Sequence, residues 1–372
     1  MPLDPFFAER LRVHRQYLIG QALKGFRARV TALWPFDREA PTAKPHPRHR
    51  SHFDARDASK RERRESPVSR TAASVPAQRR AKHRRAAFAW DRKELESVGT
   101  PGPGIPTTEH TVAVDGYPSV RLRVYRPETA GAIPGCLTFF GGAFRIGGID
   151  YPTTDAAFRR RAADSGVAII AVDYALAPEH RYPTQVEQAH AALVWLFDNA
   201  PELDLDADRI GVAGTSAGAN LAAALTLVNR DRTALPIRRQ ILEVPVTDLT
   251  GRHLDFRATR ALRIPSLLAL REMRSVASTY LPRASDACQP YASPLRATSH
   301  AGLPPAVIFT AEYDPLRGDG AAYAAALRAA GVEASAVQYL GVTHDTPIFT
   351  GALPAARRWH TDVVSALRQL HE

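Results

Sequence analysis

RIGVAGTSAGANLAAAL, residues 209–225, is the stretch that decides the fold. Residues 210–213 form a short apolar run, as expected of a buried strand, and residues 219–225 have the composition of a helix. Between these two parts stands GTSAG, residues 214–218, a G-x-S-x-G pattern. In this position the pattern predicts a sharp strand-to-helix turn that lifts one serine oxygen above a sheet.

The residue types around Ser216 have a physical reason. Gly214 and Gly218 stand two positions on either side of it, where a side chain would collide with neighbouring backbone. The pattern alone is also compatible with a plain turn between a strand and a helix. A serine becomes a strong nucleophile only when a histidine takes its proton and a carboxylate orients that histidine. We therefore look for an acidic residue and then a histidine further along the chain, each after a strand.

The positive charge of the chain is concentrated near its N-terminus. The 372 residues carry a formal charge of +11, with a net +13 over residues 1–85 and a net −2 over residues 86–372. The larger part is close to neutral, so no specific nucleic-acid partner is expected. Residues 1–85 are expected to make at most weak, nonspecific contacts with anionic surfaces. With no 18-residue apolar run and no secretory pattern at the start, we expect a cytoplasmic protein.

Three segments are predicted. Residues 1–36 form an N-terminal basic amphipathic helix, read over 5–36, that belongs to a cap, packs on the catalytic domain or lies on an anionic membrane. Residues 37–90 form a basic linker with several prolines and hardly any large apolar side chain, so we expect disorder. Residues 91–372 form the catalytic domain.

Cysteines and clustered histidines give no sign of a metal or disulfide framework. Cys136 and Cys288 lie far apart and lack CxxC spacing, so we expect both to be buried small residues. His46, His49 and His52 lack supporting cysteines or carboxylates, which favours a solvated linker over a metal site. No metal and no cofactor are expected.

Short apolar runs alternate with helical patterns from about residue 107. Runs typical of strands occupy residues 120–125, 136–140, 167–172, 210–213, 240–244, 306–310 and 334–340, and helical patterns occupy residues 183–199, 219–230 and 319–330. This alternation predicts an α/β fold in which helices cover both faces of a mostly parallel sheet.

The predicted catalytic residues follow the ends of three strands. Asp314 lies in the loop after residues 306–310, and His344 lies in the loop after residues 334–340. Functional side chains gather at this end of the strands in such sheets. Ser216, Asp314 and His344 come in the required order, so we predict that they form a catalytic triad.

Other acidic and imidazole side chains are less well placed. Asp319 lies further into the next helix and is interpreted as a helix cap. Asp345 directly follows His344, so it cannot easily turn onto that ring, and Glu312 precedes the loop. The remaining candidate histidines lie in a terminal helical stretch or before a turn into a strand; they are His300, His360 and His371.

Backbone amides that stabilise an oxyanion are expected after an early strand and directly after the nucleophile. Gly141 and Gly142 lie in the sequence FFGGAF, residues 139–144, where the absence of side chains lets the backbone approach a substrate carbonyl. We predict that the amides of Gly141, Gly142 and Ala217 form the oxyanion hole. A tight glycine turn is the alternative.

The chain from Thr107 to Leu370 resembles the hormone-sensitive-lipase-like carboxylesterases, the group IV bacterial esterases of the α/β-hydrolase fold. The resemblance rests on five ordered motifs: FGGAF at 140–144, DYALAPEHRYP at 173–183, GTSAGANLA at 214–222, YASPL at 291–295 and DPLR at 314–317. It implies an α/β-hydrolase fold with a mostly parallel central sheet flanked by helices and a helical cap. By resemblance, the cap would use the N-terminal segment and an insertion at about residues 249–290.

Several positions depart from the family pattern. Phe140 stands where the family has histidine, and Thr215 and Ala219 replace the usual aspartate and glycine around the nucleophile. Because the oxyanion hole uses backbone donors, loss of the histidine need not abolish chemistry. Phe140 would then have to be held by packing, and we expect an altered or slower esterase rather than an inactive one.

The resemblance implies a serine carboxylesterase that forms an acyl-enzyme and acts on small-molecule esters, with short acyl groups as the family expectation. A noncatalytic ligand-binding or scaffold member of the fold is the first alternative, and an amidase or deacetylase is the second. The oligomeric state, monomer or dimer, stays open.

Overall fold

A computed structural model of the chain describes residues 2–12 and 75–372. Residues 1–7 together with 81–372 form one compact unit, and residues 8–80 form a second. The described part of the helix expected over residues 5–36, residues 5–12, is helical, and its remainder lies outside the described residues.

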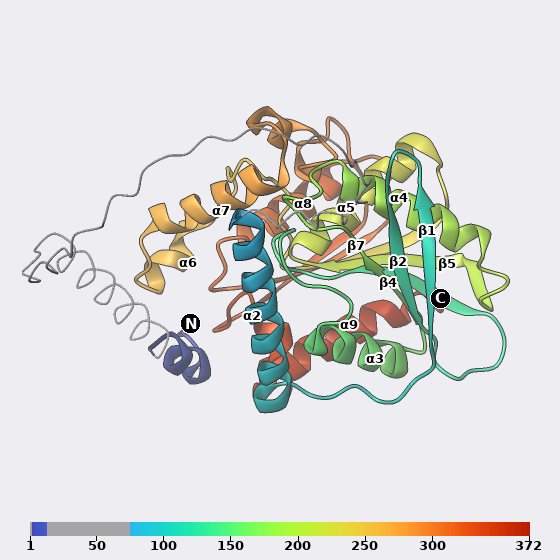
Figure 1. Cartoon of the computed structure of the whole chain (residues 1–372), viewed down its shortest axis with the longest axis horizontal. Coiled ribbons are helices and arrows are strands. Elements are labelled where there is room, and N and C mark those ends of the chain that lie inside the picture. The colour runs from blue at the N-terminus through green and yellow to red at the C-terminus, as the bar shows by residue number, and fades with distance from the viewer. Residues whose placement is uncertain (1, 13–74) are drawn as a thin grey trace, which may run out of the picture. The chain divides into compact units, whose positions relative to one another are not determined.

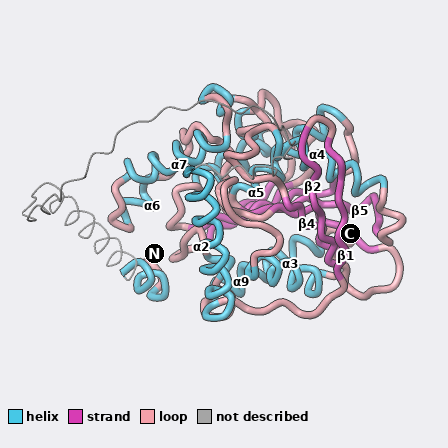
Figure 2. Tube along the Cα trace, in the orientation of Figure 1, coloured by secondary structure: helices cyan, strands magenta, loops and turns pink. Residues whose placement is uncertain are grey.

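An eight-stranded sheet forms the centre of the larger unit, in the order β1-β2-β4-β3-β5-β6-β7-β8 (Figures 1 and 2). The strands are β1 (Thr107–Val114), β2 (Tyr117–Tyr125), β3 (Ile133–Phe139), β4 (Ala168–Asp173), β5 (Leu205–Thr215), β6 (Ile237–Glu243), β7 (Ala306–Ala311) and β8 (Ala334–Tyr339). The β1–β2 and β2–β4 pairs of this sheet are antiparallel, and its other five pairs are parallel. The mostly parallel sheet expected from the sequence is confirmed.

Helices cover both faces of this sheet, as Figure 1 shows. Helices α3 (Pro152–Ser165) and α9 (Pro354–Arg368) pack together on one face, while α4 (Thr184–Asp198) and α5 (Ala217–Arg232) pack together on the other. Helix α8 (Arg317–Ala329) packs against β7 and β8. Every residue of β3 is buried, as expected for a strand covered on both faces.

Helix α2 (Val75–Val98) corrects the predicted boundary between linker and catalytic domain. It occupies the end of the 37–90 segment that was expected to be disordered; residues 37–74 lie outside the described residues. The prediction of disorder was wrong for residues 75–90 because it assumed that an ordered segment must bury large apolar side chains. The two buried side chains of α2 are polar, Asp91 and Glu94, so burial here leaves no apolar stripe in the sequence.

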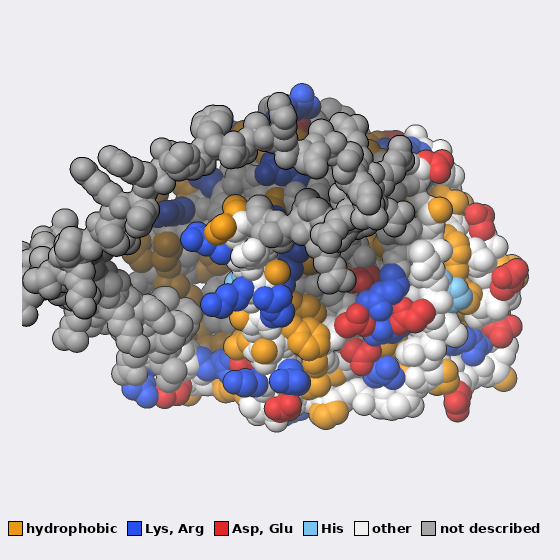
Figure 3. All heavy atoms as spheres, in the orientation of Figure 1, with side chains coloured by type: hydrophobic (Ala, Val, Ile, Leu, Met, Phe, Trp, Pro, Cys, Tyr) orange, Lys and Arg blue, Asp and Glu red, His pale blue; other side chains and the backbone are white. Residues whose placement is uncertain are grey.

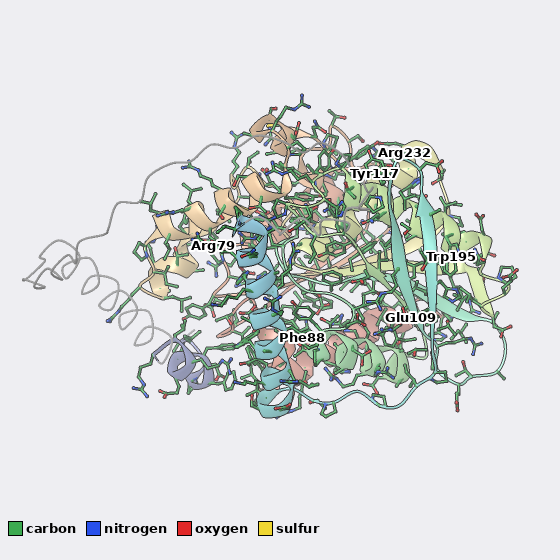
Figure 4. All side chains as sticks on the ribbon, in the orientation of Figure 1. Arg79, Phe88, Glu109, Tyr117, Trp195 and Arg232 are labelled. Atoms are coloured by element: carbon green, nitrogen blue, oxygen red, sulfur yellow. The ribbon has the colours of Figure 1, made fainter. Side chains whose placement is uncertain are left out.

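Polar contacts hold α2 against the rest of the unit. Arg84 donates to the backbone oxygens of Arg145 (2.9 Å) and Ala177 (3.0 Å) and pairs with Glu179 at 2.6 Å. Phe88 projects from the same helix (Figure 4), and its ring meets Tyr151 edge to face at 5.2 Å between centroids. α2 is therefore part of the larger unit from Ala81 onward.

The insertion expected at about residues 249–290 contains helices α6 (Phe256–Ala261) and α7 (Ser266–Tyr280) and the short helix η1 (Ala284–Cys288). Cys136 is buried, as expected, but Cys288 is exposed. The expectation of burial was wrong there because Cys288 ends the short η1 helix, where the chain turns at the surface.

Charged side chains over β1 and β2 alternate in sign, and Figure 3 shows them as an interleaved patch. Arg123 pairs with Asp150 at 2.6 Å and with Glu109, while Arg121 pairs with Asp173 at 2.9 Å. Opposite charges are thus matched locally on this face, in keeping with the near-neutral balance of residues 86–372.

Candidate active site

Ser216 stands on the sharp turn between β5 and α5. Its backbone has φ 56° and ψ −115°, a conformation that non-glycine residues rarely adopt. The turn needs the two glycines because a Cβ on Gly214 would come within 2.2 Å of the Gly218 oxygen, and a Cβ on Gly218 within 2.2 Å of the Phe139 oxygen. The amide of Ser216 donates to the backbone oxygen of Glu243 at 2.8 Å, which holds the strained residue in place.

Asp314, His344 and Ser216 form a continuous hydrogen-bonded chain. His344 Nδ1 lies 2.7 Å from Asp314 Oδ2, and His344 Nε2 lies 3.0 Å from Ser216 Oγ. The structure thus brings together the three residues that were predicted from separate strand ends, in the arrangement by which a histidine accepts a serine proton.

Asp314 is fixed by its burial and by its own loop. Only 2% of its surface is exposed, and its Oδ1 accepts the amide of Leu316 at 2.9 Å. This bond leaves Oδ2 to face His344. An oriented carboxylate selects the imidazole tautomer that carries its proton on Nδ1 and leaves Nε2 free to accept.

Opposing influences act on the pKa of His344. Burial lowers it, but the charge and hydrogen bond of Asp314, with a further contribution from the charge of Asp345, raise the pKa to about 9. The imidazolium form is therefore stabilised where a proton would arrive from Ser216.

Gly141 and Gly142 lie directly beside Ser216 in the loop after β3. A Cβ on Gly141 would lie 3.4 Å from the Ser216 Cβ, and Gly142 has φ 139°, a left-handed conformation that favours glycine. Among the described residues, no backbone oxygen accepts the amides of these two glycines. Ala217 is the first residue of α5, so its amide has no partner within the helix. Among the described residues, the amides of all three predicted donors are therefore without a backbone acceptor.

Phe140, which stands in place of the family histidine, is held by packing. Its ring stacks on Tyr174 at 4.1 Å between centroids with an interplanar angle of 7°, and 3% of its surface is exposed. The Tyr174 hydroxyl also donates to the Phe140 backbone oxygen at 2.9 Å. Two contacts with one tyrosine therefore fix the residue that precedes the glycines.

A pocket of about 380 Å³ opens over Ser216 and His344. Its walls come from the Phe140–Gly147 loop, from α3, from residues 345–348 and from Ala87, Trp90 and Asp91 of α2. None of residues 249–290 lines it. Among the described residues that precede β1 in the sequence, those that line this pocket belong to α2.

Comparison with known proteins gives a consistent result. Residues 136–348 match a family model described as an alpha/beta hydrolase fold. The chain is 35% identical over 290 residues to the carboxylesterase NlhH of Mycobacterium tuberculosis, covering 75% of this chain and 89% of that protein. It is 34% identical over 262 residues to an arylesterase of Saccharolobus solfataricus, covering 70% of this chain and 82% of that protein.

The chain belongs to the hormone-sensitive-lipase-like α/β-hydrolase family. Solved structures agree: a thermostable carboxylesterase, EstE1, cloned from a metagenomic library, superposes with a TM-score of 0.72 at 34% identity, covering 82% of this chain and 100% of that chain. An esterase of Pyrobaculum calidifontis superposes with a TM-score of 0.71 at 33% identity, covering 78% of this chain and 94% of that chain. The family resemblance drawn from the five motifs is confirmed.

One assignment within this α/β-hydrolase is corrected. Asp319 is not the cap of its own helix, since α8 has Leu316 as its N-cap residue. Its buried carboxylate instead accepts the amides of Thr247 and Asp248 at 2.8 and 2.9 Å, in the loop after β6. Burial raises the pKa of Asp319 to about 7. Its role is to hold a loop that is distant in sequence, which a local capping rule does not detect.

The three other candidate histidines have partners away from Ser216. His300 Nε2 lies 3.1 Å from the Pro294 oxygen, His360 Nε2 lies 2.7 Å from Asp164, and His371 Nε2 lies 3.0 Å from the Ser165 oxygen. Over residues 2–12 and 75–372, no three His, Cys, Asp or Glu side chains gather as metal ligands would. In the same part of the chain, no helix has the length and apolar character that crossing a membrane requires.

Two charged residues of this pocket were missed from the sequence. Arg161 of α3 lines the pocket and pairs with Glu243 at 2.8 Å. Asp91 of α2 lines it as well and binds Thr153. No local signal marks either residue, because each finds its partner through the tertiary fold.

Proposed function

We propose that this protein is a carboxylesterase that cleaves small esters through an acyl-enzyme on Ser216. The observation that carries the proposal is the unbroken hydrogen-bonded chain from Asp314 through His344 to a strained Ser216 that faces the pocket. Relatives named as carboxylesterases and arylesterases support the same reaction class.

In the first step, Ser216 Oγ attacks the ester carbonyl while His344 Nε2 takes its proton. The 3.0 Å separation of these two atoms allows the transfer without rearrangement. Asp314, 2.7 Å from Nδ1, keeps the imidazole oriented and stabilises its positive charge.

Negative charge then develops on the former carbonyl oxygen. Amides of Gly141, Gly142 and Ala217 would hold it, since backbone donors fixed in place need no reorganisation when the charge forms. His344 returns its proton to the departing alcohol, which leaves an acyl group on Ser216. A water molecule activated by His344 then releases the acid in the same way.

The pocket favours small substrates. Its volume of about 380 Å³ is near the lower end of the range for small-molecule sites, and Trp90, Phe158 and Ile348 contribute apolar surface. We therefore propose short acyl esters as substrates. Noncatalytic ligand binding does not need the hydrogen bonds that join Ser216, His344 and Asp314, whereas nucleophilic catalysis does. These hydrogen bonds therefore favour the catalytic role.

The test uses p-nitrophenyl acetate and a fluorophosphonate probe with the purified full-length chain. We expect turnover and covalent labelling of the wild type, and both to disappear in Ser216→Ala, with a loss of about four to six orders of magnitude in kcat. A Ser293→Ala variant is the control, because Ser293 is buried outside the pocket. Absence of turnover and labelling in the wild type would contradict the proposal, and activity retained by Ser216→Ala would mean that another residue is the nucleophile.

A further inference from the structure

Glu243, the last residue of β6, is bonded to the turn that carries Ser216 through both its backbone and its side chain. In the parallel pairing of β5 with β6, Thr215 is the register partner of Glu243. The Glu243 backbone oxygen accepts the Ser216 amide at 2.8 Å, and its Oε1 accepts the Thr215 hydroxyl at 3.0 Å. One residue of β6 therefore holds both the nucleophile and the residue before it.

The Glu243 carboxylate is itself fixed by two helices. Arg161 of α3 places Nη1 2.8 Å from Oε1 and Nη2 2.9 Å from Oε2. Trp359 of α9 donates its indole N–H to Oε2 at 2.8 Å. Together with the Thr215 hydroxyl, four donors face a side chain that is 1% exposed, and an ionised carboxylate offers about four acceptor positions. The carboxylate cannot turn without leaving buried donors unpaired.

Stability alone is a poor reason for a buried ion pair at this place. Removing two charges from water is costly, and well-packed apolar residues often stabilise a fold equally well. The backbone on both sides of the contact is strained, since Ser216 has φ 56° and Val244, directly after Glu243, has φ 41°. Such a φ is an outlier for a β-branched residue. Strained backbone persists only where surrounding contacts over-determine it, and it is concentrated at functional sites.

Thr215 is also adjacent to the loop that carries the predicted oxyanion donors. A Cβ on Gly141 would lie 3.1 Å from the Thr215 backbone oxygen. A shift of Thr215 would therefore change the position of Ser216 Oγ relative to both Gly141 and His344. Small misplacements of reacting atoms lower the rate steeply, even when the altered residue does not contact the substrate.

We propose that Glu243 is a positioning residue of this esterase, which holds Ser216 in the orientation for attack through its hydrogen bond with Thr215. The inference rests on the proposed esterase function. It also gives a reason for threonine at position 215, where the family has aspartate. A second carboxylate within hydrogen-bond distance of Glu243 would repel it and would have no proton to donate.

The first test removes the hydroxyl of Thr215. Thr215→Val has nearly the same shape but no donor, whereas Thr215→Ser keeps the donor and loses the methyl group. Thr226→Val is the matched control, because it removes another buried hydroxyl, one that donates to the Ala223 oxygen at 2.8 Å outside the pocket. The measurement is hydrolysis of p-nitrophenyl acetate by the full-length chain, with kcat expressed per active site titrated with a fluorophosphonate.

Thr215→Val should lower kcat and kcat/KM per titrated site by about tenfold or more and leave KM nearly unchanged. Thr215→Ser and Thr226→Val should keep values close to those of the wild type. Counting active sites separates this effect from loss of folded enzyme. If Thr215→Val yields fewer sites with the wild-type kcat, the contact is only structural and the proposal is wrong. It is equally wrong if Thr215→Ser is as slow as Thr215→Val.

The second test moves the carboxylate from one partner to the other. Thr215→Asp should be slow because two carboxylates then face each other, and Glu243→Gln should be slow because Arg161 loses its counter-charge. Thr215→Asp/Glu243→Gln has the wild-type number of charges, and the amide N–H of the introduced glutamine can donate to the introduced aspartate.

The combined variant should recover about tenfold in kcat per titrated site over Thr215→Asp, since residues in direct contact are energetically coupled. Equal rates of Thr215→Asp and the combined variant would show that the two side chains do not act on each other in catalysis, which would overturn the proposal. Failure of the wild type to hydrolyse the ester or to react with the fluorophosphonate would instead contradict the esterase function itself.

Discussion

His344 has to accept a proton from Ser216, and its surroundings favour its charged form. Asp314 lies on one side of its ring and Ser216 on the other, and Asp345 is the next residue along the chain. The raised pKa of His344 means that its neutral form, which accepts the serine proton, becomes populated only as the pH rises. Activity should therefore increase with pH through the pKa of His344 and reach a plateau above it.

Asp345→Asn tests this electrostatic account without touching the hydrogen-bonded chain. Asp345 raises the pKa of His344 through its charge, so its removal should move the midpoint of the kcat/KM profile to lower pH. Because Asp345 is exposed, salt should shrink the difference between variant and wild type. Asp206→Asn, paired with Arg209 away from the site, is the control. An unchanged midpoint in Asp345→Asn would show that this charge does not act on His344.

At the scale of elements, the N-terminus of α3 is capped by a side chain of α2, and this cap joins the two helices. Tyr151, the N-cap residue of α3, makes no side-chain cap bond. Asp91 of α2 supplies one instead, accepting the Thr153 amide at 2.9 Å and its hydroxyl at 2.5 Å. A carboxylate at a helix N-terminus satisfies free amides and complements the helix dipole.

Asp91→Ala should therefore destabilise the protein by about 1–2 kcal/mol, the usual loss for a helix cap. Asp91→Asn keeps one oxygen acceptor and should lose less. Glu96→Ala, at an exposed position of α2, should change the free energy of unfolding by no more than about 0.5 kcal/mol. Urea unfolding followed by circular dichroism measures all three variants, and equal stability of Asp91→Ala and Glu96→Ala would contradict the capping role.

These same elements show how far the sequence predicts the structure. Strand β3 was predicted because a parallel strand that is buried on both faces is a short, continuous apolar run. Ser216, Asp314 and His344 were predicted because each follows a strand in a fixed order. α2 was missed because polar side chains hold it, and the Arg161–Glu243 pair was missed because its partners are 82 residues apart. Contacts between distant side chains leave no periodic trace in a sequence.

At the scale of the whole chain, residues 4–7 pack beside the loop that carries His344. The Asp4 amide donates to the Gly341 oxygen at 2.8 Å, and Phe6 and Phe7 meet the ring of Phe349 at 5.1 and 5.5 Å between centroids. His344 lies between Gly341 and Phe349. Both ends of its loop are therefore in contact with a segment more than 330 residues away in sequence.

Phe7→Ala should weaken this arrangement and the reaction together. Phe7 is 4% exposed, and truncating a buried phenylalanine typically costs about 3–5 kcal/mol. Because the lost contact lies at one end of the His344 loop, we also expect a lower kcat from the fraction that stays folded, measured by active-site titration with the fluorophosphonate. Tyr117→Ala, at an exposed position of β2 (Figure 4), should change neither quantity appreciably. A Phe7→Ala enzyme that is less stable but has the wild-type kcat per titrated site would show that the N-terminal residues stabilise the fold without positioning His344.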